Sequence, residues 1–199
     1  MISHNLRCIL IHIPKTGGSS ITRVLDPTVQ VGGDGRQFGY DEGSMAQTNV
    51  YLEDKHVSAT YLKQKYPHIF DKYFKFALVR NPWSHIVAQY EWHTFIKTFT
   101  GRFDQYVSIY RLYQYSMLDQ LTVNGHLAVD YIGRFEQLQE SFDYVCEQLG
   151  ISKQMLPHLN LNPKKKYSHY TDYYTDNTRR LVELMHRRDI IQFGYKFGE

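Results

Sequence analysis

A short run of basic, glycine and hydroxyl residues near the start of the chain has the composition of an anion-binding loop. It consists of Lys15, Thr16, Gly17, Gly18, Ser19 and Ser20. The glycines let backbone N–H groups come close to a ligand. Residues 6–13, rich in Ile and Leu, predict a buried strand before the run, and a helical pattern opens at Ile21. This order predicts a phosphate-type site, because the N–H groups and dipole at a helix N-terminus favour anions.

The order of residues in the run differs from that of a Walker A loop. There the lysine follows the glycines, with a hydroxyl residue for Mg²⁺ next to it. Here Lys15 precedes the glycines, and the chain contains no Gly-Lys pair. This argues against a P-loop nucleotide kinase or NTPase, which stays as an alternative. A plain strand–turn–helix joint with a capping serine is the simpler alternative for the run itself.

A second basic residue, Arg80, stands at a similar junction. Residues 73–79 predict a strand, Asn81 is a good helix N-cap, and Pro82 suits the first helical turn. Arg80 is therefore expected at the carboxyl end of a strand, the edge of a parallel sheet where ligands bind. Its guanidinium can pair bidentately with a phosphate, and a structural salt bridge is the alternative.

His56 lies just before another predicted helix start. Ser58 is a good N-cap for a helix over residues 59–66, which Pro67 would end. Histidine changes its protonation near neutral pH, so it can act as a general base. By position alone, a surface histidine is the simpler interpretation.

Four segments together resemble one protein family. Residues 13–20 resemble the 5′-phosphosulfate loop of sulfotransferases that use 3′-phosphoadenosine 5′-phosphosulfate (PAPS), in the form found in carbohydrate-type (family 2) members. Residues 55–58 resemble the segment that carries the catalytic histidine of these enzymes, and residues 80–90 resemble their 3′-phosphate motif. Residues 133–138 and the order of the C-terminal segments are also similar, so the resemblance covers nearly the whole chain.

The resemblance implies metal-independent, in-line transfer of the sulfuryl group from PAPS to an acceptor hydroxyl, with a carbohydrate as the expected acceptor. It implies that His56 is the catalytic base and that Lys15 stabilises the leaving oxygen. Arg80 would bind the 3′-phosphate, and Arg134 would contact the adenosine part. The implied donor-binding residues are Lys15, Thr16, Gly17, Gly18, Ser19, Ser20, Arg80, Ser84 and Arg134.

Two positions depart from the 3′-phosphate motif of the family. His85 stands where the family often has arginine, and Ala88 stands where it usually has the serine that contacts the 3′-phosphate. Ser84, one turn earlier on the same helical face, is the residue we expect to supply the missing hydroxyl. The lost serine also leaves open a catalytically inactive module that keeps the nucleotide site.

Composition restricts the partners and the compartment. A length of 199 residues fits a single domain over 1–199, and a net charge of +3 without a long basic stripe does not indicate nucleic-acid binding. The expected partners are a small nucleotide donor and a glycan or other hydroxyl compound. The chain has no apolar run long enough to span a membrane and no signal-peptide pattern, so we expect a cytoplasmic, prokaryotic protein. Cys8 and Cys146 are expected as buried free thiols.

Alternating strand and helix patterns predict an α/β fold with a central, mainly parallel sheet flanked by helices. The resemblance implies the three-layer, P-loop-like form of this fold. Right-handed crossovers would place the loops after residues 13 and 79 at the same sheet edge. Further helices are predicted over residues 136–149 and 176–187.

Three stretches have less definite interpretations. Residues 29–50, with five glycines and no sustained period, predict a mobile loop near the mouth of the site. The aromatic residues from Phe99 to Tyr113 recur at helical spacing and predict a core stripe, with an acceptor wall as the alternative. Lys164–Lys166 predicts a solvated loop, and closure over the phosphates of the donor is the alternative.

Overall fold

Two compact units make up the protein in the computed structural model, which describes residues 1–26, 30–31, 37–38, 49–50, 56–110, 116–157 and 168–199. We call Met1–Val79 with Asp119–Asn160 the sheet unit. We call Arg80–Leu118 with Leu161–Glu199 the helical unit. The single domain over residues 1–199 stays a prediction.

A five-stranded sheet forms the centre of the sheet unit. Its strands are β1 (Ile2–Ser3), β2 (Cys8–Ile11), β5 (Asn49–Val50), β6 (Phe74–Val79) and β9 (Tyr131–Arg134). The strand order is β5-β1-β2-β6-β9, with β2, β6 and β9 parallel and the two-residue β1 and β5 antiparallel at one side. Ile11 lies opposite Ala77, and Val79 lies opposite Arg134. The three parallel strands therefore end at one edge, and the predicted mainly parallel sheet is confirmed.

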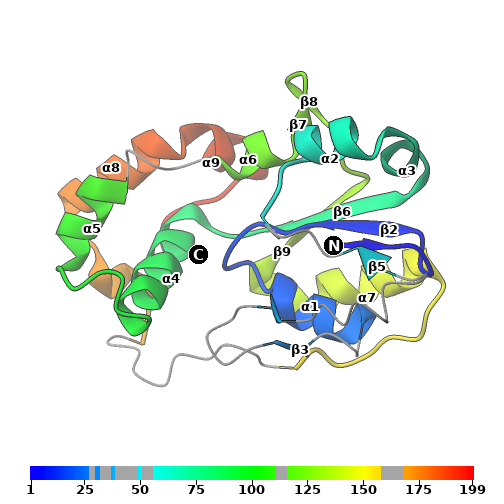
Figure 1. The fold of residues 1–199 in the computed structure, drawn as a ribbon. Helices are drawn as coiled ribbons and strands as arrows, with labels where there is room; N and C mark the ends of the chain where they lie inside the picture. The colour runs from blue at the N-terminus through cyan, green and yellow to red at the C-terminus, as the bar shows by residue number, and fades with distance from the viewer. Residues whose placement is uncertain (27–29, 32–36, 39–48, 51–55, 111–115, 158–167) are drawn as a thin grey trace. The chain divides into compact units, whose positions relative to one another are not determined.

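Helices cover both faces of this sheet (Figure 1). In the ribbon, α1 (Gly18–Leu25) and α7 (Leu138–Leu149) lie on one face, and α2 (Ala59–Lys65) and α3 (Pro67–Lys72) lie on the other. A 3₁₀ turn, η1 (Phe135–Gln137), leads from β9 into α7. Two small hairpins complete the described part of the unit: β3 (Gln30–Val31) with β4 (Gln37–Phe38), and β7 (Thr122–Val123) with β8 (His126–Leu127).

The core of the sheet unit follows from the alternation of side chains along its strands. Every second residue of β2 and β6 packs against α1 and α7. The buried members of this cluster are Met1, Cys8, Leu10, Ile21, Leu25, Phe76, Leu78, Phe142, Val145, Cys146 and Leu156. Both cysteines are buried and free, as predicted, and burial raises the pKa of the Cys8 thiol to about 12.

The helical unit packs its helices around aromatic side chains. It contains α4 (Pro82–Phe95), α5 (Phe103–Tyr110), the 3₁₀ turn η2 (Tyr170–Tyr173), α8 (Asp176–Met185) and α9 (Arg187–Phe193), and α6 (Met117–Gln120) begins in it. Its buried cluster consists of Trp83, Ile86, Val87, Phe103, Tyr106, Val107, Tyr170, Tyr173 and Val182. The core-stripe interpretation is therefore confirmed for Phe103 and Tyr106.

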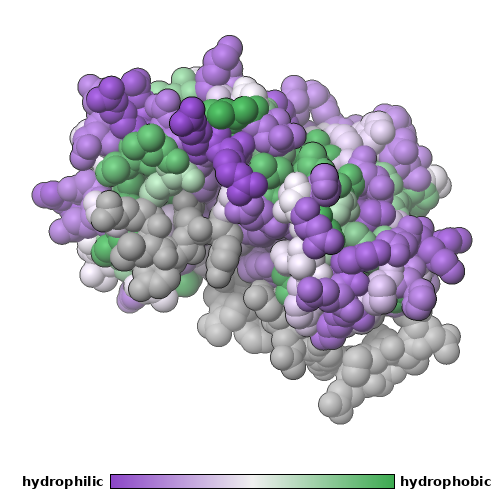
Figure 2. Space-filling view, turned by 90° about the horizontal axis from the view of Figure 1, so that it is seen from above, coloured by the Kyte–Doolittle hydropathy of each residue, from purple (hydrophilic) through white to green (hydrophobic). Residues whose placement is uncertain are grey.

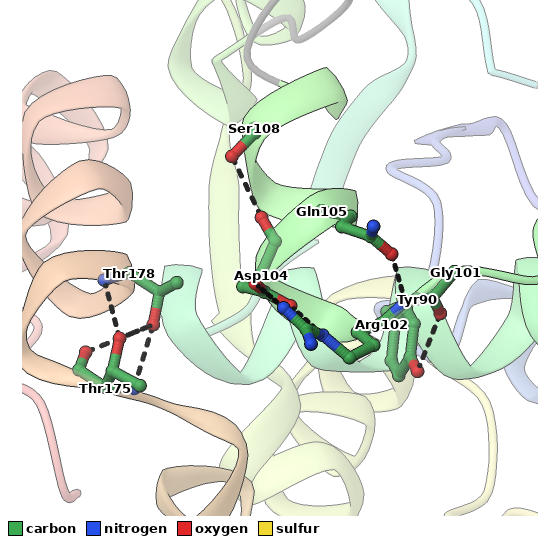
Figure 3. A network of polar contacts seen from close by, with 8 residues as sticks. All are labelled: Tyr90, Gly101, Arg102, Asp104, Gln105, Ser108, Thr175 and Thr178. Carbon is green, nitrogen blue, oxygen red and sulfur yellow. Dashed lines mark hydrogen bonds and ion pairs between the residues drawn. The ribbon is translucent and has the colours of Figure 1, made fainter.

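Polar contacts fix the starts of two of these helices (Figure 3). Asp104, in the first turn of α5, forms an ion pair with Arg102, and the Arg102 backbone N–H donates to Gln105 Oε1 at 2.8 Å. Thr175 and Thr178 form a capping box at the start of α8. Tyr90 of α4 donates its hydroxyl to the Gly101 carbonyl at 3.2 Å, which ties α4 to the segment before α5.

Several predicted boundaries differ from the observed ones. The first helix begins at Gly18, the second glycine of the run, which is three residues before the predicted start at Ile21. Pro67 ends the predicted helix at 59–66, but it also begins α3, since its missing N–H costs nothing at a first helical position. The predicted helix over 176–187 is two helices that meet at His186.

Part of the predicted organisation lies outside the described residues. Residues 158–167, which include Lys164–Lys166, are among these, as is most of the 29–50 stretch. Within the described part of the chain, no helix is long and apolar enough to cross a membrane. On the face that Figure 2 shows, hydrophobic side chains lie in separate patches among hydrophilic ones.

Candidate active site

The predicted anion loop is a sharp turn between β2 and α1. Lys15 has φ 61° and Gly17 has φ 84°, so two of three successive residues adopt the left-handed conformation. This conformation is uncommon for lysine, and such backbone strain often marks functional sites. The Thr16 hydroxyl donates to the Ile13 carbonyl at 2.8 Å and is buried, so it holds the turn closed. Its backbone N–H, rather than this hydroxyl, is therefore the Thr16 group suited to an anionic ligand.

The first turn of α1 suits an anion. Gly17 is the N-cap residue, so no side-chain oxygen caps the helix, and no acidic residue lies in its first turn. An uncapped first turn has N–H groups and a positive dipole end for a negative ligand. The Thr22 hydroxyl donates to the Gly18 carbonyl at 2.8 Å, which stabilises this turn from within.

Each of the two glycines is required for a separate reason. A side chain at Gly17 would be strained by its positive φ and would lie 2.8 Å from Leu138 Cδ2. At Gly18, a Cβ would lie 2.3 Å from Cδ2 and 2.4 Å from Nε2 of His12. Gly18 therefore allows a buried imidazole to lie directly against the first residue of α1.

His56, the predicted base, lies beside this loop. It stands two residues before Ser58, whose hydroxyl caps α2 by accepting from the Tyr61 N–H at 3.3 Å. His56 Nδ1 lies 3.0 Å from the carbonyl oxygen of His12, and the two imidazole centroids are 4.8 Å apart. A carbonyl oxygen only accepts, so Nδ1 carries the proton and the lone pair of the neutral ring is on Nε2. The structure thus brings the predicted base and the predicted loop together within the sheet unit.

Arg134, the third predicted residue of this unit, ends β9 opposite Val79. Its N–H donates to the Ser141 hydroxyl at 2.9 Å, and this hydroxyl donates to the Arg134 carbonyl at 3.2 Å. Ser141 reaches the strand because Gly133 has no side chain, since a Cβ there would lie 2.6 Å from that of Ser141. The backbone of Arg134 is thus fixed by α7, while its side chain is only half-buried.

Arg80 and Ser84 lie in the helical unit, where the structure brings them together. Arg80 directly follows Val79, the last residue of β6. Its Nε donates to Ser84 Oγ at 3.0 Å. Asn81 is the N-cap of α4, as predicted: its side-chain oxygen accepts from the N–H groups of Trp83 and Ser84, and its amide donates to the Lys196 carbonyl at 2.8 Å. The predicted arginine therefore sits at the capped start of a helix.

The two departures from the family motif, His85 and Ala88, differ in burial on α4. His85 is buried, with Nε2 3.5 Å from Gln89 Nε2, so it does not present a surface cation as an arginine would. Ala88 and Ser84 are both half-buried and one turn apart. This spacing is consistent with Ser84 taking the place of a serine at position 88.

Sequence reasoning missed two residues that shape the site. We treated His12 only as the end of a buried strand, yet it contacts both His56 and the loop. Its one visible signal is a histidine within the apolar run, three residues before Lys15. Ser141 was read as part of a helix, and its hydrogen bonds to Arg134 have no local signal. Among the described residues, no group of three or more His, Cys, Asp or Glu side chains could hold a metal ion.

Comparison with known proteins identifies the family. A family model described as the sulfotransferase family matches residues 1–196. The chain belongs to this sulfotransferase family. The resemblance to family 2 sulfotransferases is thereby confirmed. The match extends over both units of this sulfotransferase.

A curated relative is similar over part of the chain. It is a protein of Archaeoglobus fulgidus with the description "Uncharacterized protein", 29% identical over 103 residues, which are 50% of this chain and 86% of the relative. No solved structure gives a significant match.

Proposed function

We propose that this sulfotransferase moves the sulfuryl group of PAPS to a hydroxyl of a carbohydrate acceptor. The observation that carries the proposal is the contact between His56 and His12, three residues before Lys15 of the anion loop. This contact supports the proposal because His56, the proposed base, lies next to a strained, uncapped strand-to-helix turn with an adjacent lysine. A P-loop-like fold, in which this turn is the phosphosulfate loop, is part of the proposal.

The sheet unit would provide the reaction centre. Backbone N–H groups of residues 16–19 hold the phosphosulfate, and the Lys15 ammonium lies near the bridging oxygen. The Ser20 N–H, which we also expected to contribute, instead donates to the Gly17 carbonyl at 3.0 Å. The acceptor oxygen bonds to sulfur as the bond between sulfur and that bridging oxygen breaks. The electron pair leaves with adenosine 3′,5′-bisphosphate, where Lys15 stabilises the negative charge. His56 Nε2 takes the proton of the acceptor hydroxyl, because Nδ1 is already protonated.

The remaining donor contacts would recognise the nucleotide. The Arg80–Ser84 pair binds the 3′-phosphate, with the guanidinium supplying charge and the serine a hydroxyl proton. This proton can be donated because Ser84 Oγ accepts from Arg80. Arg134 contacts the adenosine part. We propose no metal in this reaction, because a sulfuryl group carries less charge than a phosphoryl group. A cytoplasmic location stays a prediction.

The experiment that tests the proposal is transfer of radiolabelled sulfate from PAPS to a panel of saccharides. We expect His56→Ala to lower the turnover about 10²- to 10⁴-fold, the range for a positioned base, while adenosine 3′,5′-bisphosphate binds within a few-fold of wild type. His4→Ala is the matched control, because His4 pairs with Tyr73 within the same unit. Turnover within a few-fold of wild type in His56→Ala would show that another group is the base.

The same preparation tests the two alternatives. A nucleotide kinase or NTPase would be stabilised in a thermal melt by Mg-ATP, whereas the proposed enzyme is stabilised by adenosine 3′,5′-bisphosphate without metal. An inactive module would bind the bisphosphate but transfer no label to any acceptor.

A further inference from the structure

His12 occupies a position that the proposed mechanism does not use. It follows Ile11, the last residue of β2, and stands three residues before Lys15. Only 5% of its surface is exposed. A histidine buried at the carboxyl end of a central strand lies where ligands bind in parallel sheets.

Two contacts restrain the imidazole of His56 through this one residue. The backbone carbonyl of His12 accepts the Nδ1 proton of His56 at 3.0 Å. The His12 ring lies against the His56 ring, with centroids 4.8 Å apart and planes tilted by 58°. The hydrogen bond fixes which nitrogen carries the proton, and the ring contact limits rotation of the side chain. Together they set the direction of Nε2.

A third contact joins His12 to the anion loop. The Cδ2–Nε2 edge of its ring lies so close to Gly18 that a Cβ there would be 2.3 Å from Cδ2. Gly18 is the first residue of α1. The same imidazole therefore contacts both the predicted base and the helix N-terminus where the donor is proposed to bind. A shift of either one would be transmitted to the other through a buried ring, because close-packed interiors transmit strain.

We propose that His12 is the positioning residue of this site, which directs His56 Nε2 toward the acceptor hydroxyl that attacks a sulfuryl group bound at the start of α1. This role rests on the proposed function. His12 touches neither the donor nor the acceptor, and it acts through the orientation of His56 alone.

This role predicts a specific kinetic pattern. Loss of the His12 ring should lower kcat about 10²-fold, the cost of a misplaced catalytic group, with little change in the affinity for the bisphosphate. Because His12 acts through His56, its removal should have no further effect once His56 is absent. A ring of similar shape should restore most of the rate, since it refills the space against Gly18 and His56.

The test compares His12→Ala, His12→Phe, His56→Ala and the double variant His12→Ala/His56→Ala. We expect a loss of about 10²-fold in kcat for His12→Ala, recovery to within a few-fold of wild type for His12→Phe, and equal rates for His56→Ala and the double variant. His4→Ala, in which a histidine–tyrosine hydrogen bond of the same unit is lost, should match wild type. A further loss in the double variant, or a rate within twofold of wild type in His12→Ala, would overturn the proposal.

A second measurement needs no turnover. In ¹⁵N NMR of the full chain, His56 should be protonated at Nδ1 in wild type. This tautomer should persist in His12→Ala, because the acceptor is the backbone carbonyl of residue 12, while loss of the ring contact should broaden the His56 ring signals. Nε2 protonation of His56 in wild type would overturn the proposal even if the variants do not fold. If wild type transfers no sulfate, the proposed function fails, and the NMR result alone decides whether His12 positions His56.

Discussion

Gly17 and Gly18 are adjacent but serve different parts of the site. Gly17 lets the backbone adopt φ 84°, which forms the turn, whereas Gly18 gives the His12 ring its space. The neighbour of Gly17 is the flexible end of Leu138, which can move aside. The neighbour of Gly18 is a buried ring that already contacts His56. A substitution at Gly18 should therefore disturb the base as well as the loop.

We predict that Gly18→Ala destabilises the fold by ~1–3 kcal/mol, the usual cost of overpacking, and lowers PAPS turnover. Chemical denaturation and a turnover assay measure the two effects. Gly150→Ala is the control, because Gly150 has φ 67° but nothing within 4 Å of an added Cβ. This control substitution should lower the free energy of unfolding by ~1–2 kcal/mol, through the left-handed backbone alone, and leave turnover unchanged. Wild-type stability and turnover in Gly18→Ala would contradict this account of the loop.

Ser84 is predicted to replace the serine that the family motif has at position 88. Ser84→Ala should weaken adenosine 3′,5′-bisphosphate about tenfold, since a hydrogen bond to a charged phosphate is lost, and should leave adenosine 5′-monophosphate unaffected. Ala88→Ser in the Ser84→Ala background should recover part of the affinity, because the two positions are one turn apart. Calorimetric titration measures both, and an equal loss for the two nucleotides would contradict the assignment.

At the scale of elements, boundaries with local chemical signals could be predicted. Ser58, Asn81 and Gly150 each lie at the helix end that their side chain or backbone favours. The division between α8 and α9 has no proline or glycine signal. It occurs at His186, whose ring hydrogen-bonds Asp189, and Asp189 in turn accepts from the start of α6 about 70 residues earlier in the chain. Contacts of this kind are invisible in a local pattern.

Asp189 is the buried acceptor on which this junction depends. It accepts hydrogen bonds from His186 Nδ1 at 3.0 Å, Leu118 N–H at 2.9 Å, Met117 N–H at 3.1 Å and the Ser116 hydroxyl. Burial alone would raise the pKa of its carboxyl, but the hydrogen bonds from His186, Ser116 and Leu118 lower it below the ordinary value. The charged form is therefore the one that stabilises the helical unit.

We predict that Asp189→Asn destabilises the protein by ~1–3 kcal/mol at pH 7, because an amide cannot accept all four hydrogen bonds. A lowered carboxyl pKa gives stability that is present above the unfolded value of about 4 and lost as the pH falls through the folded value. Wild type should therefore lose stability below about pH 4 more steeply than the variant. Parallel slopes in urea unfolding across this range would contradict the prediction.

Part of the candidate site could be predicted, because its signals are local in the sequence. The loop from Lys15 to Ser20 and the cap at Asn81 are continuous in sequence, so residue type and order indicate them. The resemblance, rather than geometry, singled out His56. Its hydrogen bond to His12 spans 44 residues, and the His12–Gly18 contact depends on how a strand end packs on a helix start. Tertiary packing decides both, which is why His12 was missed.

At the scale of the whole molecule, the proposed nucleotide contacts are divided between the two units. Lys15, His56 and Arg134 belong to the sheet unit, and Arg80 and Ser84 belong to the helical unit. The chain passes from the first to the second at Val79–Arg80, directly at the end of β6. The proposed function requires the 5′ end of the nucleotide to bind at the α1 loop and its 3′-phosphate to bind at Arg80.

The binding of adenosine 3′,5′-bisphosphate and adenosine 5′-monophosphate to wild type, Lys15→Ala and Arg80→Ala tests this requirement most directly. In wild type, the 3′-phosphate should improve affinity about 10- to 100-fold, the range for charge-assisted hydrogen bonds to arginine. Arg80→Ala should abolish this advantage, so that both nucleotides bind alike, and Lys15→Ala should weaken both while keeping their ratio. An unchanged ratio in Arg80→Ala would contradict the claim that Arg80 binds the 3′-phosphate of the donor.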